Sequence, residues 1–269
     1  MRPPAHVLDA FGATGPAARL TGGRGTAWRV GNVLLKPLDV LPEELDWLHL
    51  ASRNVNAAEI RLSLPIMSRA GELVVDGWTA SPVLEGEHRA GKWTEIARVA
   101  FEFADQFRGV DRPAFLDERT HAWSRADRLA WGEREPADID GAPFLADLLA
   151  ARLAISEPPG IVHGDLSGNV LFDEMHVPSV IDLTLYWRPV KYSVAIVAVD
   201  GACFEGAPVS LLETIEPSEH FSQYLVRALI FRIATDWFNK LTASQLTIYE
   251  DVSRRVLELV SADGRIRHE

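Results

Sequence analysis

The sequence reads Ile161-Val-His-Gly-Asp-Leu-Ser-Gly-Asn-Val-Leu-Phe-Asp173 past its middle, and Val180-Ile-Asp-Leu183 follows shortly afterwards. The segment places two acids and an amide, Asp165, Asn169 and Asp182, at the edges of short apolar runs that are typical of buried strands. Carboxylate and amide oxygens suit Mg²⁺, and a further acid can orient a hydroxyl group. Composition alone favours a plain β-meander with glycines and aspartates as turn residues. The order of the residues must therefore distinguish a meander from a functional site.

Helical periodicity surrounds this island of short strands. Apolar residues recur every three or four positions from Trp93 to Phe107 and again from Phe144 to Ile155. Two more helices are expected near the end of the chain, over Ser218–Lys240 and over Tyr249–Leu259. The second part of the chain is therefore predicted to be mainly helical.

The first third of the chain is predicted to be rich in β-structure. Gly31-Asn32 separates two short apolar runs, which is a hairpin signal because both residues tolerate positive φ. Pro42 suits the first turn of a short helix. Strands are expected over Leu62–Met67 and Leu73–Leu84, although Asp76-Gly77 within the second run is equally compatible with a tight turn.

These patterns predict an α+β protein with two lobes. The N-lobe, residues 1–84, is the small β-rich part, and the C-lobe, residues 85–269, is the larger and mainly helical part. The catalytic insert of strands and loops occupies residues 161–183 of the C-lobe, and the lobes are expected to join near residues 80–86.

Composition and charge narrow the classes of function. The 269 residues carry 38 acidic and 27 Lys/Arg side chains, a formal net charge of −11, which argues against nucleic acid or an anionic membrane as the main partner. The longest apolar run, Val194–Val199, is far shorter than the roughly 20 residues of a membrane span. The single cysteine, Cys203, excludes an internal disulfide and favours a reducing compartment, so a cytoplasmic protein is expected.

The order His163-Gly-Asp, then Asn169, an apolar strand and Ile181-Asp182 resembles the catalytic loop of the aminoglycoside phosphotransferase family, which has a bilobal protein-kinase-like fold. The resemblance implies that Asp165 is the catalytic base and that His163 supports the loop. It implies that Asn169 and Asp182 bind Mg²⁺, that ATP is the phosphate donor and that a small-molecule hydroxyl is the acceptor.

The N-terminal part has segments that match this order. Glycines in Thr21-Gly-Gly-Arg-Gly-Thr26 allow a backbone to approach phosphates, and Lys36 is placed to neutralise the α- and β-phosphates. The spacing of the full glycine motif fails, because Trp28 occupies the third glycine position. The nucleotide-binding residues predicted here are Gly22, Gly23, Gly25 and Lys36.

A kinase-like lysine normally pairs with a glutamate from a helix, and Glu44 is the first candidate here. Each candidate is also explained as a solvated charge on a helix. The other candidates are Glu43, Asp46 and Glu59.

One departure from the family motif leaves an alternative function open. Only three residues separate Asp165 from Asn169, whereas the family pattern has four. The alternative function is therefore a catalytically weak or inactive pseudokinase that senses nucleotide.

The spacing of the residues in Gly86–Lys92 fits a phosphate-binding P-loop. A P-loop needs Ser or Thr directly after its lysine, and Trp93 occupies that position, so we exclude a P-loop here.

Overall fold

The computed structural model describes residues 2–20, 25–51, 53, 55–134 and 139–266, which fold as two compact units. Neither unit is one continuous stretch, whereas the sequence predicted a division into residues 1–84 and 85–269. The predicted catalytic insert is itself divided, because residues 169–183 belong to the first unit. The first unit comprises Met1–His88, Pro113–Asp117 and Asn169–Leu183, and the second comprises Arg89–Arg112, Glu118–Gly168 and Thr184–Glu269.

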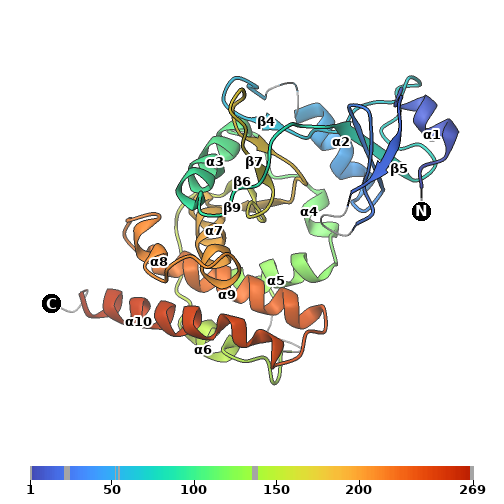
Figure 1. The fold of residues 1–269 in the computed structure, drawn as a ribbon. Coiled ribbons are helices and arrows are strands. Elements are labelled where there is room, and N and C mark those ends of the chain that lie inside the picture. Colours follow the sequence, from blue (N-terminus) through green and yellow to red (C-terminus); the bar gives the residue numbers. More distant parts are fainter. Residues whose placement is uncertain (1, 21–24, 52, 54, 135–138, 267–269) are drawn as a thin grey trace. The chain divides into compact units, whose positions relative to one another are not determined.

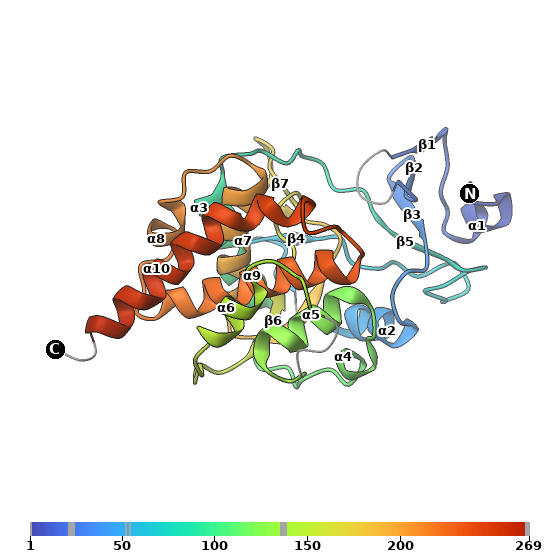
Figure 2. The same cartoon turned by 90° about the horizontal axis from the view of Figure 1, so that it is seen from below.

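The first unit contains a four-stranded antiparallel sheet with the order β1-β2-β3-β5 (Figure 1; all four strands are labelled in Figure 2). Its central hairpin is the one predicted around Gly31-Asn32, with Val30 opposite Val33. Gly31 has a φ of 58°, and a Cβ there would lie 2.5 Å from the carbonyl oxygen of Thr14, so the turn requires glycine. The strands are β1 (Ala17–Arg19), β2 (Trp28–Val30), β3 (Val33–Pro37) and β5 (Trp78–Pro82).

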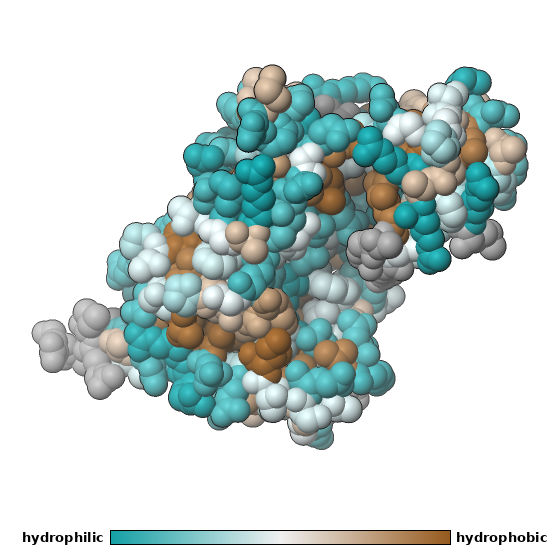
Figure 3. All heavy atoms as spheres, viewed as in Figure 1, coloured by the Kyte–Doolittle hydropathy of each residue, from teal (hydrophilic) through white to brown (hydrophobic). Residues whose placement is uncertain are grey.

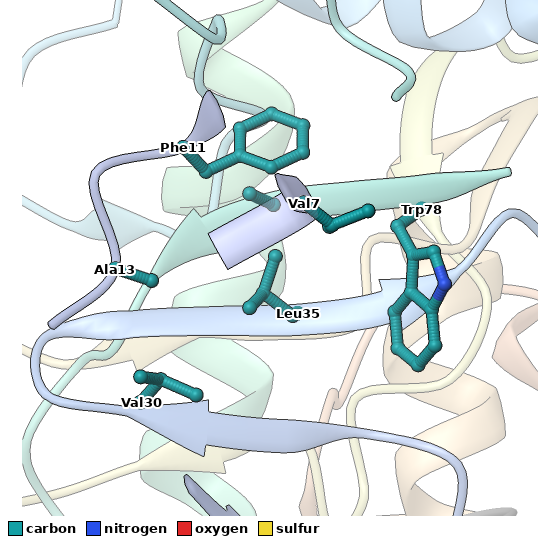
Figure 4. Close-up of a cluster of buried hydrophobic side chains, with 7 residues drawn as sticks. Val7, Phe11, Ala13, Val30, Leu35 and Trp78 are labelled. Atoms are coloured by element: carbon teal, nitrogen blue, oxygen red, sulfur yellow. The ribbon is translucent and has the colours of Figure 1, made fainter. Parts of the chain in front are cut away.

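A cluster of buried apolar side chains packs against this sheet (Figure 4). Val7 comes from helix α1 (Ala5–Ala10), Phe11 follows that helix, and Leu35 and Trp78 come from β3 and β5. Because side chains alternate along a strand, the burial of Leu35 directs its neighbour Lys36 to the other face of the sheet. The core thus fixes the strand that carries the predicted phosphate-binding lysine.

A second, smaller sheet in the first unit has the order β4-β8-β7. β4 (Arg61–Leu62) runs parallel to β8 (Ser179–Val180), which pairs antiparallel with β7 (Val170–Leu171). This long-range pairing explains why the end of the predicted catalytic insert belongs to the first unit.

The second unit is mainly helical and is organised around helix α9 (Phe221–Phe238). This helix packs against α5, α6, α7 and α10 (Figures 1 and 2). A two-stranded antiparallel sheet, β6 (Gly160–His163) with β9 (Leu185–Arg188), leads into the His163-Gly-Asp segment. The other elements are α3 (Trp93–Gln106), α5 (Ala122–Trp131), α6 (Leu145–Ala150), α7 (Val190–Phe204), α8 (Leu211–Thr214), η2 (Gln245–Tyr249) and α10 (Glu250–Ile266), while α4 (Phe115–Glu118) spans the boundary between the units.

Some expected elements are shorter than predicted. The run Leu73–Leu84 contains a turn, in which Asp76 and Gly77 both have positive φ, and only Trp78–Pro82 forms a strand. The helix expected over Phe144–Ile155 is confined to Leu145–Ala150. The predicted helices that end the chain are confirmed as α9 and α10.

Polar side chains dominate the face of the molecule in Figure 3, where apolar residues form separate patches. Within the described part of the chain, no helix combines the length and the apolar character that crossing a membrane requires.

Candidate active site

Lys36 and Asp182 meet within the first unit. Lys36 lies on β3 and Asp182 lies two residues after β8, and Lys36 Nζ donates to Asp182 Oδ1 at 3.2 Å. Lys36 Nζ also lies 3.2 Å from Asp39 Oδ1. Burial lowers the pKa of the Lys36 ammonium, but attraction by the Asp182 and Asp39 carboxylates outweighs it, so the pKa is raised and the group is charged at neutral pH.

The structure corrects the predicted partner of this lysine. Among the described residues, the ion-pair partners of Lys36 are Asp182 and Asp39, not Glu44. Glu44 is buried in α2 (Pro42–Ala51), whereas Asp39 lies in the short connection between β3 and α2. Three residues of separation bring Asp39 back to the lysine, so the partner is local.

Asn169 and Asp182 occupy neighbouring places in the first unit. Asn169 immediately precedes β7, and its carbonyl oxygen accepts a hydrogen bond of 3.0 Å from the Ile181 N–H. Asp182 has a φ of 48°, a left-handed conformation that costs a non-glycine residue about 1–3 kcal/mol and clusters at functional sites. The backbone here therefore holds a carboxylate-bearing residue in a strained conformation next to an amide-bearing one.

The donor chemistry of this pair fits Mg²⁺. A carboxylate and an amide supply the hard oxygens that Mg²⁺ takes, and this ion usually completes its shell with waters and phosphates. In the described residues there is no group of three or more His, Cys, Asp or Glu side chains arranged to hold a metal. Asn169 and Asp182 are the residues that could hold the ion, with a phosphorylated ligand supplying further oxygens.

The predicted glycine loop is only partly within the described residues. Gly22 and Gly23 lie outside them. Gly25 has a φ of 63°, and its carbonyl oxygen accepts a hydrogen bond of 2.7 Å from Arg19 Nε. A glycine conformation thus precedes β2, as expected for a backbone that turns tightly before the hairpin.

His163 and Asp165 lie in the second unit, directly after β6. The Asp165 N–H donates to His163 Nδ1 at 3.1 Å, and the Gly164 N–H donates to the Thr184 carbonyl at 2.9 Å. The His163 side chain is only 1% exposed and lies edge-on to the Phe103 ring, with centroids 5.4 Å apart. These contacts make His163 a support of the loop, the role that the sequence predicted for it.

The Asp165 carboxylate has a partner that sequence reasoning missed. Arg232 Nη2 on α9 donates to Asp165 Oδ1 at 2.7 Å, and Arg232 Nε donates to Asp200 Oδ1 on α7 at 2.7 Å. The only signal in the sequence is a single charge at each of two apolar runs: Asp200 directly follows Val194–Val199, and Arg232 lies inside Ala228–Ala234. A buried charge of this kind requires an opposite partner, but the pattern does not say which one.

The sequence-predicted residues thus form two groups. The first unit contains Lys36, Asn169, Asp182 and Gly25, and it pairs Lys36 with Asp182. The second unit contains Asp165 with its buried arginine.

Comparison with solved structures identifies the fold. The chain matches an aminoglycoside phosphotransferase from Alicyclobacillus acidocaldarius with a TM-score of 0.61 at 15% identity, over 100% of this chain and 98% of that one. It matches AMP-bound spectinomycin phosphotransferase APH(9)-Ia with a TM-score of 0.58 at 14% identity, over 96% of each chain. A mutant of APH(4)-Ia in complex with ADP and hygromycin B gives 0.56 at 13% identity, over 96% of this chain and 97% of that one.

Comparison of sequences identifies the family. No curated protein sequence matches the chain significantly. The family described as "Phosphotransferase enzyme family" matches residues 35–187, more than half of the chain, and this range includes Lys36, Asp165, Asn169 and Asp182. The expected α+β, protein-kinase-like architecture is confirmed by the solved structures reported above. The chain therefore belongs to the phosphotransferase enzyme family.

Proposed function

We propose that this protein transfers the γ-phosphoryl group of ATP to a hydroxyl group of a small molecule, with Mg²⁺ as the metal ion. The pairing of Lys36 with Asp182 carries the proposal, because it joins the lysine of a nucleotide-binding strand to the acid expected at the metal. Membership of the phosphotransferase family supports the reaction class. The nucleotides bound in the complexes of spectinomycin phosphotransferase and APH(4)-Ia support the donor.

Each residue has a distinct task in this proposal. Lys36 neutralises charge on the α- and β-phosphates, and Asn169 and Asp182 hold Mg²⁺, which offsets the charge of the phosphates when bound. Asp165 accepts the proton of the acceptor hydroxyl. The hydroxyl oxygen forms a bond to the γ-phosphorus as the bond from that phosphorus to the bridging oxygen breaks, and ADP leaves.

The short loop between Asp165 and Asn169 favours one alternative, a pseudokinase that binds nucleotide without transferring phosphate. The loop has three intervening residues and turns at Gly168, which has a φ of 79°. A loop of this length presents Asn169 differently from the four-residue pattern of the family. The alternative differs from the enzyme in turnover, not in nucleotide binding.

The experiment that tests the function measures binding and turnover separately. We expect thermal stabilisation by ATP that increases with Mg²⁺, and slow release of phosphate from MgATP when water replaces the acceptor. Asp165→Asn is expected to remove this hydrolysis, because positioned proton transfer contributes about 10²–10⁴-fold, and to leave the affinity for MgATP nearly unchanged. Binding without hydrolysis by the wild type would favour the pseudokinase, and absence of binding would contradict both functions.

A further inference from the structure

The side chain of Asp165 is the outer member of a three-residue network in the second unit. The side chains of Arg232 and Asp200 are 7% and 4% exposed, whereas that of Asp165 is 28% exposed. Arg232 contacts both oxygens of Asp200, through Nε to Oδ1 at 2.7 Å and through Nη2 to Oδ2. The same Nη2 donates to Asp165 Oδ1 at 2.7 Å.

The network contains two carboxylates and one guanidinium, so one negative charge remains on its outer member, Asp165. Asp200 balances the Arg232 guanidinium in the interior, since a buried charge is tolerated only when it is paired. The guanidinium fork is rigid, so its bond to Asp200 determines the direction of the bond to Asp165. Trp123 and Phe231 further confine the guanidinium, with its carbon 5.4 Å and 5.3 Å from their ring centroids.

We propose that Asp200 and Arg232 are positioning residues that hold the catalytic carboxylate of Asp165 in the orientation needed to accept the hydroxyl proton. The inference rests on the proposed function, in which Asp165 is the base. Two helices, α7 and α9, hold this carboxylate through one arginine, while the Asp165 backbone is held independently by its bond to His163. The backbone contact places the residue, and the arginine orients its side chain.

A structural role and a positioning role of Asp200 and Arg232 predict different activities for the same variants. Arg232→Met alone leaves Asp200 buried without its cation, and we expect strong destabilisation. Replacing both members by apolar residues, as in Asp200→Leu combined with Arg232→Met, is expected to recover most of the stability. A structural role predicts that activity returns with stability, whereas a positioning role predicts that it does not.

The test compares thermal stability with MgATP hydrolysis in the double variant Asp200→Leu/Arg232→Met. We expect near-normal stability, a KM for MgATP within a few-fold of the wild type and a kcat lower by about 10²-fold, the cost of a misplaced group. Arg232→Lys retains the charge without the fork and is expected to be impaired as well. Arg188→Lys is the matched control, because the Arg188 side chain is only 11% exposed and also bridges two acids, Asp127 and Glu133.

A crystal structure of the double variant provides a readout that does not depend on activity. We expect Asp165 to keep its backbone position and to change its side-chain rotamer. An unchanged rotamer, or a folded double variant with wild-type kcat, would overturn the proposal. Failure of the wild type to bind MgATP would instead contradict the proposed function, and the rotamer would still test the network. If Arg232→Lys lowers kcat no more than the Arg188→Lys control does, the positioning role is also overturned.

Discussion

Lys36 Nζ donates a hydrogen bond to Asp182 Oδ1 at 3.2 Å, although the two residues are 146 positions apart in the sequence. The β3 strand holds the lysine, and the β4-β8-β7 sheet holds the segment that ends at the aspartate. The Lys36 side chain is 30% exposed and that of Asp182 is 63% exposed, so the pair contributes little to stability. Because Asp182 is the proposed metal ligand, we expect its partner Lys36 to bind the nucleotide.

Replacing the lysine is expected to weaken nucleotide binding without unfolding the protein. Lys36→Met removes the charge that faces the phosphates, and we expect the affinity for MgATP to fall at least about tenfold by calorimetry. The free energy of unfolding is expected to fall by no more than about 1 kcal/mol. Lys191→Met is the control, because Lys191 is also an ion-paired lysine, with Glu157 as its partner, but lies in the second unit. Equal affinities of the two variants would contradict this role of Lys36.

The two acids beside Lys36 are expected to differ in their dependence on Mg²⁺. Asp182→Asn weakens the proposed metal site, so Mg²⁺ should no longer increase the stabilisation that ATP produces in a thermal-shift measurement. Asp39→Asn removes the other partner of Lys36 and leaves the metal ligands in place. We therefore expect it to retain the response to Mg²⁺. If Asp182→Asn binds MgATP as tightly as the wild type, the assignment of this ligand is wrong.

The hairpin that carries the lysine strand is expected to depend on Gly31. Gly31→Ala places a Cβ 2.5 Å from the Thr14 carbonyl oxygen in a backbone with positive φ. We expect a loss of about 1–3 kcal/mol in the free energy of unfolding, measured with urea. Gly71→Ala is the control, since its φ is also positive but no atom lies within 4 Å of its Cβ. If the contact with the Thr14 carbonyl oxygen is destabilising, Gly31→Ala should be clearly less stable than Gly71→Ala.

Local patterns predicted much of the fold. The hairpin at Gly31-Asn32 and the amphipathic helix that begins at Trp93 both follow from a few neighbouring residues. Helix α7 was not predicted, because its buried residues Tyr192–Gly201 cover every side and leave no helical period in the hydrophobicity. The placement of residues 169–183 in the first unit could not be predicted either, because it depends on the pairing of β4 with β8.

The site was predicted residue by residue rather than as an arrangement. The family motif pointed to Asp165 and Asp182, and the order of elements pointed to Lys36. The partners of these residues were harder to predict. Asp39 is near Lys36 in sequence and was overlooked in favour of a helix residue, whereas Arg232 comes from a helix 67 positions after Asp165. Tertiary packing alone creates that contact.

Cys203 is expected to be unreactive in the folded protein. Burial, with a smaller contribution from the charge of Asp200, raises the pKa of its thiol to about 12. A thiol in an unfolded chain has a pKa of about 8.5, so at pH 8 the reactive thiolate is roughly a thousandfold scarcer in the folded state. Alkylation by iodoacetamide, followed by mass spectrometry, should be at least about 100-fold slower than in guanidinium chloride.

The same shift predicts a loss of stability at alkaline pH. A group whose pKa is raised by folding contributes stability that is complete below its unfolded pKa and is lost as pH rises toward the folded value. The contribution of Cys203 should therefore decrease from about pH 8.5 upward. Cys203→Ala should flatten this part of the stability profile, and a profile that keeps its slope would contradict the assignment.

Gly164 is expected to be essential for turnover because Tyr186 lies against it. A Cβ on Gly164 would lie 2.3 Å from Cε2 and 2.4 Å from Cδ2 of the Tyr186 ring. That ring is 3% exposed and packs edge-on to Phe231, so it has little room to move. Gly164→Ala must therefore displace either the ring or the backbone that leads directly to Asp165. We expect kcat for MgATP hydrolysis to fall by about 10²-fold.

A matched pair of variants separates this clash from a general effect of alanine. Gly160 lies on the same segment, and a Cβ there would have no atom within 4 Å, so Gly160→Ala should retain wild-type kcat. The affinity for MgATP should be retained in both variants, because Lys36 and Asp182 belong to the first unit. Adding Tyr186→Ala to Gly164→Ala removes the clashing ring, and partial recovery of kcat is expected. If Gly164→Ala hydrolyses MgATP as fast as Gly160→Ala, then the backbone at Gly164 does not position Asp165.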